Sequence, residues 1–591
     1  MNDILINPDE LSFLLWDWLR LDDLLASEGS DIDREAAEAI LDLSHKVATD
    51  TFLPLFKLSD NREPYLENGQ VHALPEIAHA LRGYAELGLF SAGFSEELGG
   101  LGLPSLLSSA SFAQFLAASL AVSAYPMLTT ANARLIVTFG SEAQVDTFAR
   151  PQIAGEWFGT MCLSEPQAGS NLADVATRAM PDGEDEWGAR YRLHGNKMWI
   201  SGGDHDLSGN IVHLVLAKIP DETGQIGQDT RGISLFIVPK VLPSGERNDI
   251  AVAGLNHKLG YRGTTNCLLN MGEGAEQPDG RAGALGWLVG APGQGLPQMF
   301  QMMNEARLNV GLGAAAMGYR GYRHALHYSQ ERLQGSAPGA ADKRSGPIIR
   351  HPDVRDMVMA AKCYGEGALA LVLYCARLVD TAEQDEADDA LLSLLTPVAK
   401  TWPSEWGLAA DDLAIQVHGG YGYTRDFDVE QLWRDNRLNP IHEGTTGIQA
   451  LDLVGRKIRR DTAGAFDMLD ERVRAVAARA AGTALADLGQ GLNAAWGRIV
   501  TVVAQLRGMD SVAAATNATG FLRAFGHVVV GWQWLDRALL CLDADPADAL
   551  RAGKPWACRY FFEREIPKID AWLRPVETGS QLLMEIPENA L

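Results

Sequence analysis

The sequence predicts a mainly α-helical protein with a central antiparallel β-domain. Apolar residues recur at helical spacing on both sides of a middle stretch, residues 156–285, which consists instead of short apolar runs separated by Gly, Asp and Pro. The chain has 591 residues, more than one hydrophobic core normally serves, so we expect several domains.

The N-terminal part predicts an arm and a helical domain. In residues 1–35, leucines and Trp18 lie on an acidic background, so this arm would pack on its own chain or on a second subunit. Residues 36–155 predict an all-helical domain with a break at residues 93–104. The β-domain at 156–285 follows, with the runs YRLHGNKMWIS, IVHLVLAKI and GISLFIVPK.

The C-terminal half predicts helices throughout. Residues 295–460 form a bundle with a loop at 335–347 and an acidic connector at 381–390, and residues 461–591 form an extra helical domain ending in an irregular tail. The run GLGAAAMG at 311–318 satisfies a loose dinucleotide-binding pattern. That fingerprint requires a preceding strand, whereas a helical pattern precedes it here, so close helix packing explains the glycines better.

Composition excludes several classes of partner. The net charge of −26 argues against nucleic acid and anionic membrane surfaces, because both attract Lys and Arg. The six cysteines lie far apart without a C-x-x-C pair, which fits a reducing compartment and predicts no metal site. No Lys or Arg precedes Arg20, and the longest apolar run, residues 368–376, is shorter than the ~20 residues of a spanning helix. We expect a cytoplasmic protein without stable membrane insertion.

The stretch NPIHEGTTGIQALDLVGRKIR, from Asn439 to Arg459, places one carboxylate, Glu443, beside a glycine turn and before an amphipathic helix. Pro440 would end any helix arriving from the N-terminal side, and the glycines allow backbone N–H groups to approach a ligand. Taken alone, such a carboxylate is more often a helix-start or surface residue than a base. Three other stretches change this interpretation.

These stretches are MCLSEPQAGSNL at 161–172, KMWISGG at 197–203 and QVHGGYGYTRDF at 416–427. Together with IHEGTTGIQ they resemble, in order and spacing, the signature segments of the flavin-dependent acyl-CoA dehydrogenase family, and four motifs in register are a specific signal. The resemblance covers residues 36–460. The rest resembles the extra helical domain of the longer members, particularly bacterial enzymes acting on fatty acyl-CoA or 3-methylthiopropanoyl-CoA.

The resemblance implies an FAD enzyme that converts a saturated acyl-CoA into the 2,3-enoyl-CoA. Glu443 stands where the family's base takes the α-proton while flavin N5 receives the β-hydride, and its backbone N–H would donate to the thioester oxygen. Some members carry the base immediately before an arginine on a helix. That position is Ala306 here, and Glu305 lies about 100° away around the helix, which favours Glu443. Substrate contacts are implied for Ser170, Asn304, Arg307 and Gly444, although Arg307 could equally form a salt bridge with a neighbouring helix.

The resemblance also assigns FAD contacts. Trp199 would lie against the isoalloxazine, with the Ser201 hydroxyl toward N5; most members have Thr there, so positioning would be looser. Arg332 would reach the pyrophosphate of the neighbouring subunit's FAD, so each cofactor would be bound across an interface. His442, where Tyr is common, could titrate near neutrality. The implied set is Cys162, Leu163, Ser164, Gly169, Ser170, Trp199, Ile200, Ser201, Arg332, Gln416, Gly419, Gly420, Gly444, Thr445 and Gln449.

The resemblance further implies electron-transfer flavoprotein as the partner and a homodimer, in which the extra domain covers the face that shorter members use to form a dimer of dimers. An apolar stripe in that domain must be buried somewhere; its members are Ile499, Val502, Val503 and Leu506. Two alternatives share the fold, an acyl-CoA oxidase and a DNA-binding flavoprotein with a basic C-terminal domain. Acidic and basic side chains are nearly balanced in residues 461–591, which disfavours the second. The expected substrate is a medium- or long-chain fatty acyl-CoA, with 3-methylthiopropanoyl-CoA as the alternative.

Overall fold

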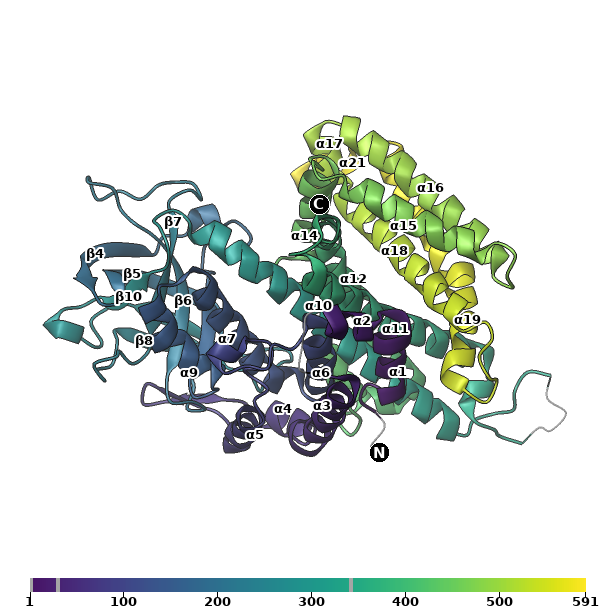
Figure 1. The fold of residues 1–591 in the computed structure, drawn as a ribbon, viewed down its shortest axis with the longest axis horizontal. Coiled ribbons are helices and arrows are strands. Elements are labelled where there is room, and N and C mark those ends of the chain that lie inside the picture. Colours follow the sequence, from purple (N-terminus) through teal and green to yellow (C-terminus); the bar gives the residue numbers. More distant parts are fainter. Residues whose placement is uncertain (1–3, 28–31, 340–343) are drawn as a thin grey trace. The chain divides into compact units, whose positions relative to one another are not determined.

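The computed structural model describes residues 4–27, 32–339 and 344–591 (Figure 1). The chain divides into two compact units. We call Met1–His45, Pro104–Ala117 and Arg307–Leu591 the helical unit, and Lys46–Leu103 with Ala118–Ala306 the mixed unit. Both units are assembled from separate stretches of sequence, which the linear order of helical and β patterns does not predict.

The mixed unit is built on an eight-stranded sheet in the order β10-β7-β6-β4-β5-β9-β8, with β3 beside β6 (Figure 1). Because β10 pairs with both β7 and β5, part of the sheet closes on itself as a barrel. The strands are β3 (Phe158–Cys162), β4 (Arg178–Asp185), β5 (Gly188–Ser201), β6 (Ile211–Lys218), β7 (Ile233–Pro239), β8 (Ile250–Leu255), β9 (Asn266–Met271) and β10 (Ala284–Leu288).

Two pairings depart from the predicted antiparallel pattern, since β4 also pairs in parallel with β6 where Arg178 lies opposite Lys218. β3 pairs in parallel with β6, from Phe158 opposite Ile211 to Cys162 opposite Val215. All five residues of β3 and all eight of β6 are buried, and strands covered on both faces are typical of parallel pairing. The fold class, helices around a central β-domain, is confirmed.

α7 (Leu120–Phe139) of the mixed unit packs on one face of this sheet. Leu128 and Ile136 of one helix meet Leu214 and Ile237 of the sheet in a single apolar cluster. The mixed unit also contains α4 (Leu55–Asn61), α5 (Pro75–Glu86), α8 (Glu142–Gln144) and α9 (Arg150–Ile153).

The prediction of an all-helical N-terminal domain is wrong at one place. A hairpin joins β1 (Tyr65–Glu67) to β2 (Gln70–His72). Its turn is Asn68-Gly69, and both residues have positive φ, 51° and 77°. Asn-Gly is the preferred pair for such a turn because both residues tolerate the left-handed conformation.

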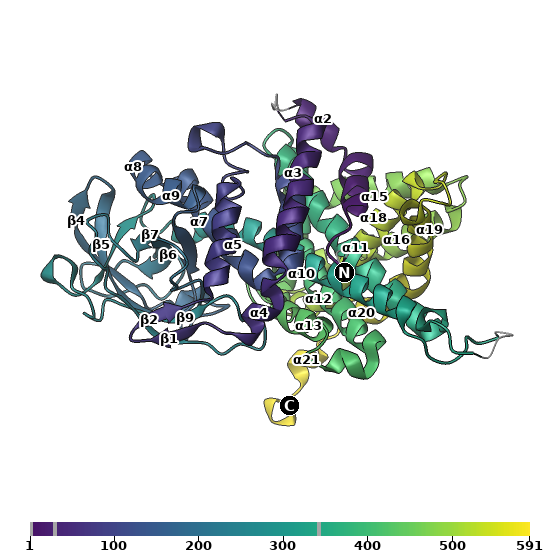
Figure 2. The ribbon, with the colours of Figure 1, turned by 90° about the horizontal axis from the view of Figure 1, so that it is seen from below.

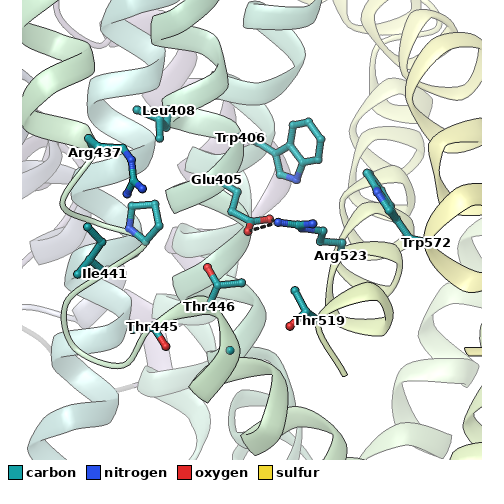
Figure 3. A pocket seen from close by; sticks show the side chains of 12 residues that line it. Glu405, Trp406, Leu408, Arg437, Ile441, Thr445, Thr446, Thr519, Arg523 and Trp572 are labelled. Atoms are coloured by element: carbon teal, nitrogen blue, oxygen red, sulfur yellow. Dashed lines mark hydrogen bonds and ion pairs between the residues drawn. The ribbon is translucent and has the colours of Figure 1, made fainter. Parts of the chain in front are cut away.

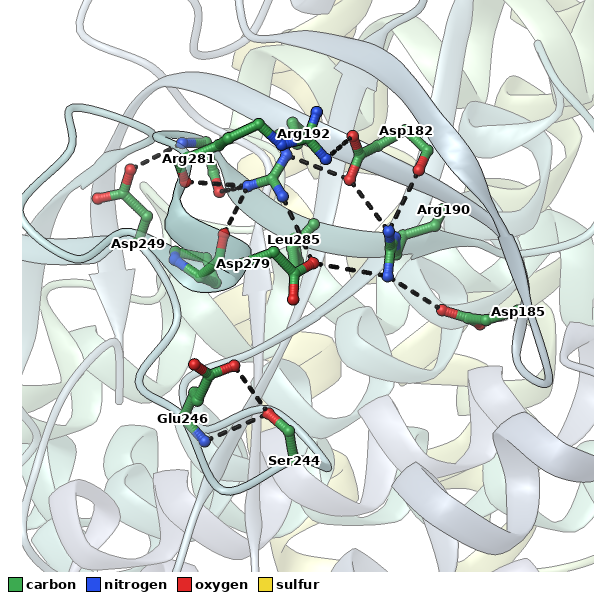
Figure 4. Close-up of polar contacts among 12 residues, drawn as sticks. Asp182, Asp185, Arg190, Arg192, Ser244, Glu246, Asp249, Asp279, Arg281 and Leu285 are labelled. Carbon is green, nitrogen blue, oxygen red and sulfur yellow. Dashed lines mark hydrogen bonds and ion pairs between the residues drawn. The ribbon is translucent and has the colours of Figure 1, made fainter.

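Paired charges stabilise one end of the barrel (Figure 4). Arg192 pairs with Asp182 at 3.1 Å, and its Nη1 donates to the carbonyl oxygens of Pro278 and Arg281. Arg281 in turn donates to Asp182 at 2.7 Å. These contacts join the β4–β5 hairpin to the loop before β10.

The helical unit contains the remaining helices. α10 (Gly295–Glu331) runs into it from the mixed unit. The predicted close packing of the glycines in residues 311–318 is confirmed, because a Cβ at Gly311 would come within 2.0 Å of the Ala399 carbonyl oxygen. The others are α1 (Pro8–Ser12), α2 (Leu21–Ser27), α3 (Arg34–Val47), α6 (Ser105–Ala118), α11 (Pro352–Thr381), α12 (Glu386–His418), α13 (Val429–Asn436), α14 (Thr446–Asp452), α15 (Ala465–Ala480), α16 (Ala486–Gly508), α17 (Ser511–Thr516), α18 (Ala518–Leu540), α19 (Ala549–Tyr560), α20 (Ile569–Glu577) and α21 (Leu582–Glu585).

The N-terminal arm packs on its own chain. Trp18 donates its indole N–H to Asp536 at 2.8 Å. The ammonium of Lys554 is completely buried between the carboxylates of Glu10 and Glu366. The arm was predicted to pack on its own chain or on a second subunit. The structure shows that it packs on its own chain.

The C-terminal extension is a compact helical bundle with a projecting end. Its predicted apolar stripe on α16 is buried within the chain, so it provides no argument for a dimer. After α20 the tail is not wholly irregular, since it forms the short helix α21, which extends away from the bundle (Figure 2).

Among the described residues, one helix, α11, is long and apolar enough to cross a membrane by length and composition alone. The search for an uninterrupted apolar run in the sequence did not find α11, because polar residues interrupt the apolar stretch of this helix. Of its most apolar window, 83% is buried inside the protein, as in a core helix.

Candidate active site

The turn that carries Glu443 lies between α13 and α14 in a strained backbone conformation. Glu443 has φ +51° and Gly444 φ +89°. A non-glycine residue rarely adopts this left-handed region and persists there only where its surroundings enforce it. Such strain is concentrated at functional sites, which supports the predicted importance of this turn.

Side chains from two helices hold the turn. Gln449 of α14 donates its amide N–H to the carbonyl oxygens of Glu443 at 3.1 Å and Gly444 at 3.3 Å. Thr445 accepts from the N–H of Ile448 and so caps α14. From α12, Lys400 donates to the carbonyl oxygen of Asn439 at 2.6 Å. Gln449, predicted as an FAD contact, is fully buried and directed at the backbone of the turn.

Burial raises the pKa of Glu443, and the nearby charges of Lys400 and Arg307 only partly oppose this effect. A raised pKa is what a carboxylate needs to act as a base toward a weakly acidic C–H. Lys400 is itself fully buried, and burial lowers its pKa to about 8. Sequence reasoning missed Lys400, although a lone lysine within the apolar stretch of residues 391–402 was a usable signal.

His442 does not behave as predicted. Burial and the Lys400 charge lower its pKa to about 3, so it stays neutral instead of titrating near neutrality. Its Nε2 lies 3.1 Å from the Asn439 side-chain oxygen and can donate to it. The departure from the family's tyrosine therefore adds no ionisation near pH 7.

The candidate residues on α10 have defined partners. Arg307 is buried and pairs with Asp452 of α14 at 2.9 Å, so its ion pair lies inside the helical unit and not on the surface. In the mixed unit, Glu305 pairs with Arg134 at 3.4 Å. Asn304 also belongs to the mixed unit.

Within the mixed unit, the structure brings together the two predicted flavin-binding segments. The N–H of Met198 donates to the carbonyl oxygen of Ser164 at 3.0 Å, which joins the segment after β3 to β5. β5 carries an extra residue against β9 between Lys197 and Ile200, a bulge that includes Trp199. Trp199 has φ +65° and is 60% exposed, so it is not an ordinary core residue of a strand. A strained, exposed indole offers a flat face for a planar ring.

A buried ion pair that sequence reasoning missed fixes these segments. Lys197 donates to Glu165 at 2.8 Å and to the carbonyl oxygens of Leu163 and Leu216. Burial opposes the ionisation of Glu165, but the Lys197 charge and several hydrogen bonds outweigh it and lower the pKa of Glu165. The remaining predicted residues here differ in exposure: Cys162 and Ile200 are buried, Leu163, Ser164 and Ser201 partly buried, and Gly169 and Ser170 exposed.

The helical unit contains a second candidate cofactor surface. A cavity of about 460 Å³ is lined by three of the four residues predicted to contact a neighbouring subunit's FAD, namely Arg332, Gly419 and Gly420; Gln416 does not line it. Gly419 has φ +61°, and a Cβ at Gly419 or Gly420 would meet nothing within 4 Å, so the backbone is open to a ligand. An exposed arginine beside open glycine backbone fits a pyrophosphate.

Four family descriptions match the chain in order. "Acyl-CoA dehydrogenase, N-terminal domain" matches residues 39–156, the middle domain residues 160–272 and the C-terminal domain residues 293–458. "Acetyl-CoA dehydrogenase C-terminal like" matches residues 469–587. The extension is thus a recognised part of longer relatives.

Two curated relatives are similar over most of their length. The 3-methylmercaptopropionyl-CoA dehydrogenase of Ruegeria pomeroyi is 34% identical, with 88% of this chain and 87% of the relative covered. The broad-specificity linear acyl-CoA dehydrogenase FadE5 of Mycobacterium tuberculosis is 32% identical over 99% of both chains.

Solved structures show the same fold. ACDH-11 of Caenorhabditis elegans in complex with C11-CoA has a TM-score of 0.77 at 20% identity, covering 97% of this chain and 94% of that one. An acyl-CoA dehydrogenase from Bacillus anthracis complexed with FAD has a TM-score of 0.74 at 21% identity, covering 94% and 90%. With the matches across all four regions, these findings confirm the predicted resemblance: the chain belongs to the acyl-CoA dehydrogenase family and, like that family, uses FAD.

Proposed function

We propose that this acyl-CoA dehydrogenase converts a medium- or long-chain fatty acyl-CoA into its 2,3-enoyl-CoA, with Glu443 as the base. The observation that carries the proposal is the strained, partly buried turn that gives Glu443 a raised pKa. A relative named as a broad-specificity linear acyl-CoA dehydrogenase, 32% identical over 99% of both chains, supports a linear acyl-CoA as the substrate.

In this proposal the carboxylate of Glu443 takes the α-proton of the thioester. The backbone N–H of Glu443 donates to the thioester oxygen, and Gln449 helps to keep that N–H in place because it binds the carbonyl oxygens of Glu443 and Gly444. FAD, when bound, would supply the acceptor for the hydride that leaves Cβ, so that loss of the α-proton and of this hydride gives the 2,3-enoyl product. Trp199 and Ser201 would hold the flavin ring, and Arg332, Gly419 and Gly420 the nucleotide end of a neighbouring subunit's cofactor.

3-Methylthiopropanoyl-CoA is a second candidate substrate, because a relative that is 34% identical over 88% of this chain carries that activity in its name. Anaerobic bleaching of the flavin by a series from propanoyl-CoA to palmitoyl-CoA, with 3-methylthiopropanoyl-CoA included, tests both. Highest kcat/KM for an acyl chain of eight or more carbons supports the first proposal. Highest kcat/KM for the methylthio substrate supports the second.

We further propose that electrons pass to an electron-transfer flavoprotein and that the protein is a cytoplasmic homodimer. The cofactor surface on the helical unit supports the dimer, because Tyr421 and Tyr423 are 55% and 91% exposed beside the glycines. Light scattering that shows a tetramer would contradict it. The DNA-binding alternative gains no support, because arginines of the extension pair with carboxylates, such as Arg498 with Glu577 and Arg559 with Asp487.

A further inference from the structure

The segment of α12 that carries Lys400 depends on contacts from outside the helix. Pro397 and Pro403 lie inside α12 on either side of Lys400. A proline in a helix interior removes a backbone hydrogen bond and bends the helix, so the backbone alone holds this segment weakly. Lys400 is fully buried and donates to the carbonyl oxygen of Asn439 at 2.6 Å, in the turn that carries Glu443. Whatever holds this segment therefore also sets where Lys400 meets the turn.

The C-terminal extension packs on the other side of this segment. Trp402 follows Lys400 by two residues, about 200° around the helix, and so lies on the nearly opposite side of α12. Its buried indole N–H donates to Nδ1 of His527 on α18 at 3.0 Å. A Cβ at Gly526 of α18 would lie 3.0 Å from the Trp402 ring, so the two helices approach closely here. The extension thus holds α12 opposite Lys400.

A second contact joins the same two helices (Figure 3). Arg523 of α18 is bidentate to Glu405 of α12, with both N–O distances 3.0 Å. Both side chains line a cavity of about 730 Å³ that is also lined by Thr445 of the turn. α18 packs against α14 as well, the helix that follows the turn. The extension therefore contacts both the helix that carries Lys400 and the helix that begins beside Glu443.

His527 can accept from Trp402 only while its ring is neutral. Burial lowers the pKa of His527, against the opposing effect of Glu565, and so favours the neutral form. With Nδ1 as the acceptor, the ring proton lies on Nε2, which is 3.5 Å from the Glu565 carboxylate. Glu565 in turn pairs with Lys568 at 2.7 Å. The contact between α18 and α12 thus has a defined tautomer.

Lys400 is surrounded by charged groups from α10, from its own helix and from the turn. Burial lowers the pKa of Lys400, Glu443 and Glu405 oppose this effect, and Arg307 adds to it. His442 beside Lys400 is neutral, because burial lowers its pKa to about 3. Because Lys400 also lowers the pKa of Glu443, the distance between these two groups enters directly into the acidity of the proposed base.

We propose that the C-terminal extension positions the turn that carries Glu443, by holding α12 through Trp402 and Glu405. The inference rests on the proposed role of Glu443 as the base, and it gives the extension a part in that reaction. The residues that act on the base through Lys400 are positioning residues, namely Trp402, Glu405, Arg523 and His527.

The test uses two variants that disturb the hold on α12 without changing the net charge of the protein. Trp402→Phe keeps an aromatic ring but has no N–H donor. Glu405→Gln with Arg523→Gln removes the bidentate pair as a whole, at a partly exposed site where the fold should survive. The control, Asp487→Asn with Arg559→Gln, removes an ion pair of 3.0 Å that joins two helices of the extension to each other.

For each protein we measure the acid limb of kcat/KM and, independently of activity, amide hydrogen exchange of the peptide 439–449. Both α12 variants should move the limb to higher pH, by less than Lys400→Met does, because a displaced Lys400 lowers the pKa of Glu443 less. They should also speed exchange in this peptide about threefold or more. The control should change neither. In a Lys400→Met background the α12 variants should move the limb no further, because the residue through which they act is gone.

An unmoved acid limb in both α12 variants, even with a lower melting temperature, overturns the proposal and leaves the two contacts a purely structural part. A shift that persists in the Lys400→Met background overturns it too, because the extension would then act by another route. Circular dichroism checks the fold, and the ion-pair variant decides if Trp402→Phe does not fold. Failure of the proposed base looks different, since Glu443→Gln would then keep its turnover. Exchange of the peptide would in that case decide alone, and unchanged exchange would overturn the proposal.

Discussion

Gln449 donates its side-chain N–H to the carbonyl oxygen of Glu443 at 3.1 Å, so the helix after the turn holds the backbone of the proposed base. The same amide reaches the carbonyl of Gly444, and together these bonds stabilise two consecutive residues with positive φ. The position of the base therefore depends on a residue six positions later in the sequence.

Replacing Gln449 by Met should lower kcat while FAD stays bound. Two partly buried carbonyl groups lose their donor, which costs about 1–3 kcal/mol, and the strained turn relaxes. Steady-state kinetics with flavin absorbance as the loading control measures this. Gln384→Met, at an exposed site, is the matched control. Normal kcat in Gln449→Met would show that the turn does not need the bond.

Glu443→Gln should abolish substrate-dependent bleaching while acyl-CoA and FAD still bind. The amide keeps the volume of the side chain but cannot take a proton, and a general base contributes ~10²–10⁴-fold before the gain from placement. Anaerobic stopped-flow with acyl-CoA, followed by dithionite to confirm reducible flavin, tests it. Loss of turnover in Glu305→Gln but not in Glu443→Gln would move the base to α10.

Lys400→Met should shift the acid limb of kcat/KM to higher pH. The Lys400 charge lowers the pKa of Glu443, so removing it favours the protonated carboxyl, and a higher pH is needed to produce the active carboxylate. The pH profile of kcat/KM measures the shift. His442→Gln should leave the limb in place, because His442 is already neutral across this range. A shifted acid limb in His442→Gln, with an unchanged limb in Lys400→Met, would assign this ionisation to His442.

Lys197→Met should destabilise the mixed unit by about 3–5 kcal/mol, because it leaves the buried Glu165 carboxylate without its partner. Denaturant unfolding measures this, and Lys197→Met with Glu165→Gln should recover part of the loss. Since the folded pKa of Glu165 is lowered, its stabilisation is present above the usual glutamate pKa and is lost as pH falls through the lower folded value. If the losses in unfolding free energy of the two single variants simply add in the double variant, Lys197 and Glu165 are not coupled.

Arg332→Ala should lose FAD but keep its fold, because one phosphate contact is removed at ~2–5 kcal/mol. Flavin content after dialysis, with circular dichroism as the fold control, measures the effect. Arg355→Ala, an exposed arginine of α11, should keep its FAD. Unchanged flavin affinity in Arg332→Ala would assign Arg332 to the surface.

The sequence by itself determined the family, the fold class and the candidate base, because motif order, hydrophobic period and turn residues are local properties of the chain. Asn68-Gly69 belonged to that local information too, and its hairpin was missed only because helical spacing surrounds it. Only the tertiary structure shows which buried charged side chains lie near one another. Lys400 lies 43 residues before Glu443, and Lys197 lies 32 residues after Glu165, so no local pattern connects them. Likewise, only the fold shows that Glu443 has a raised pKa and His442 a lowered one, because a pKa depends on what surrounds a side chain in space.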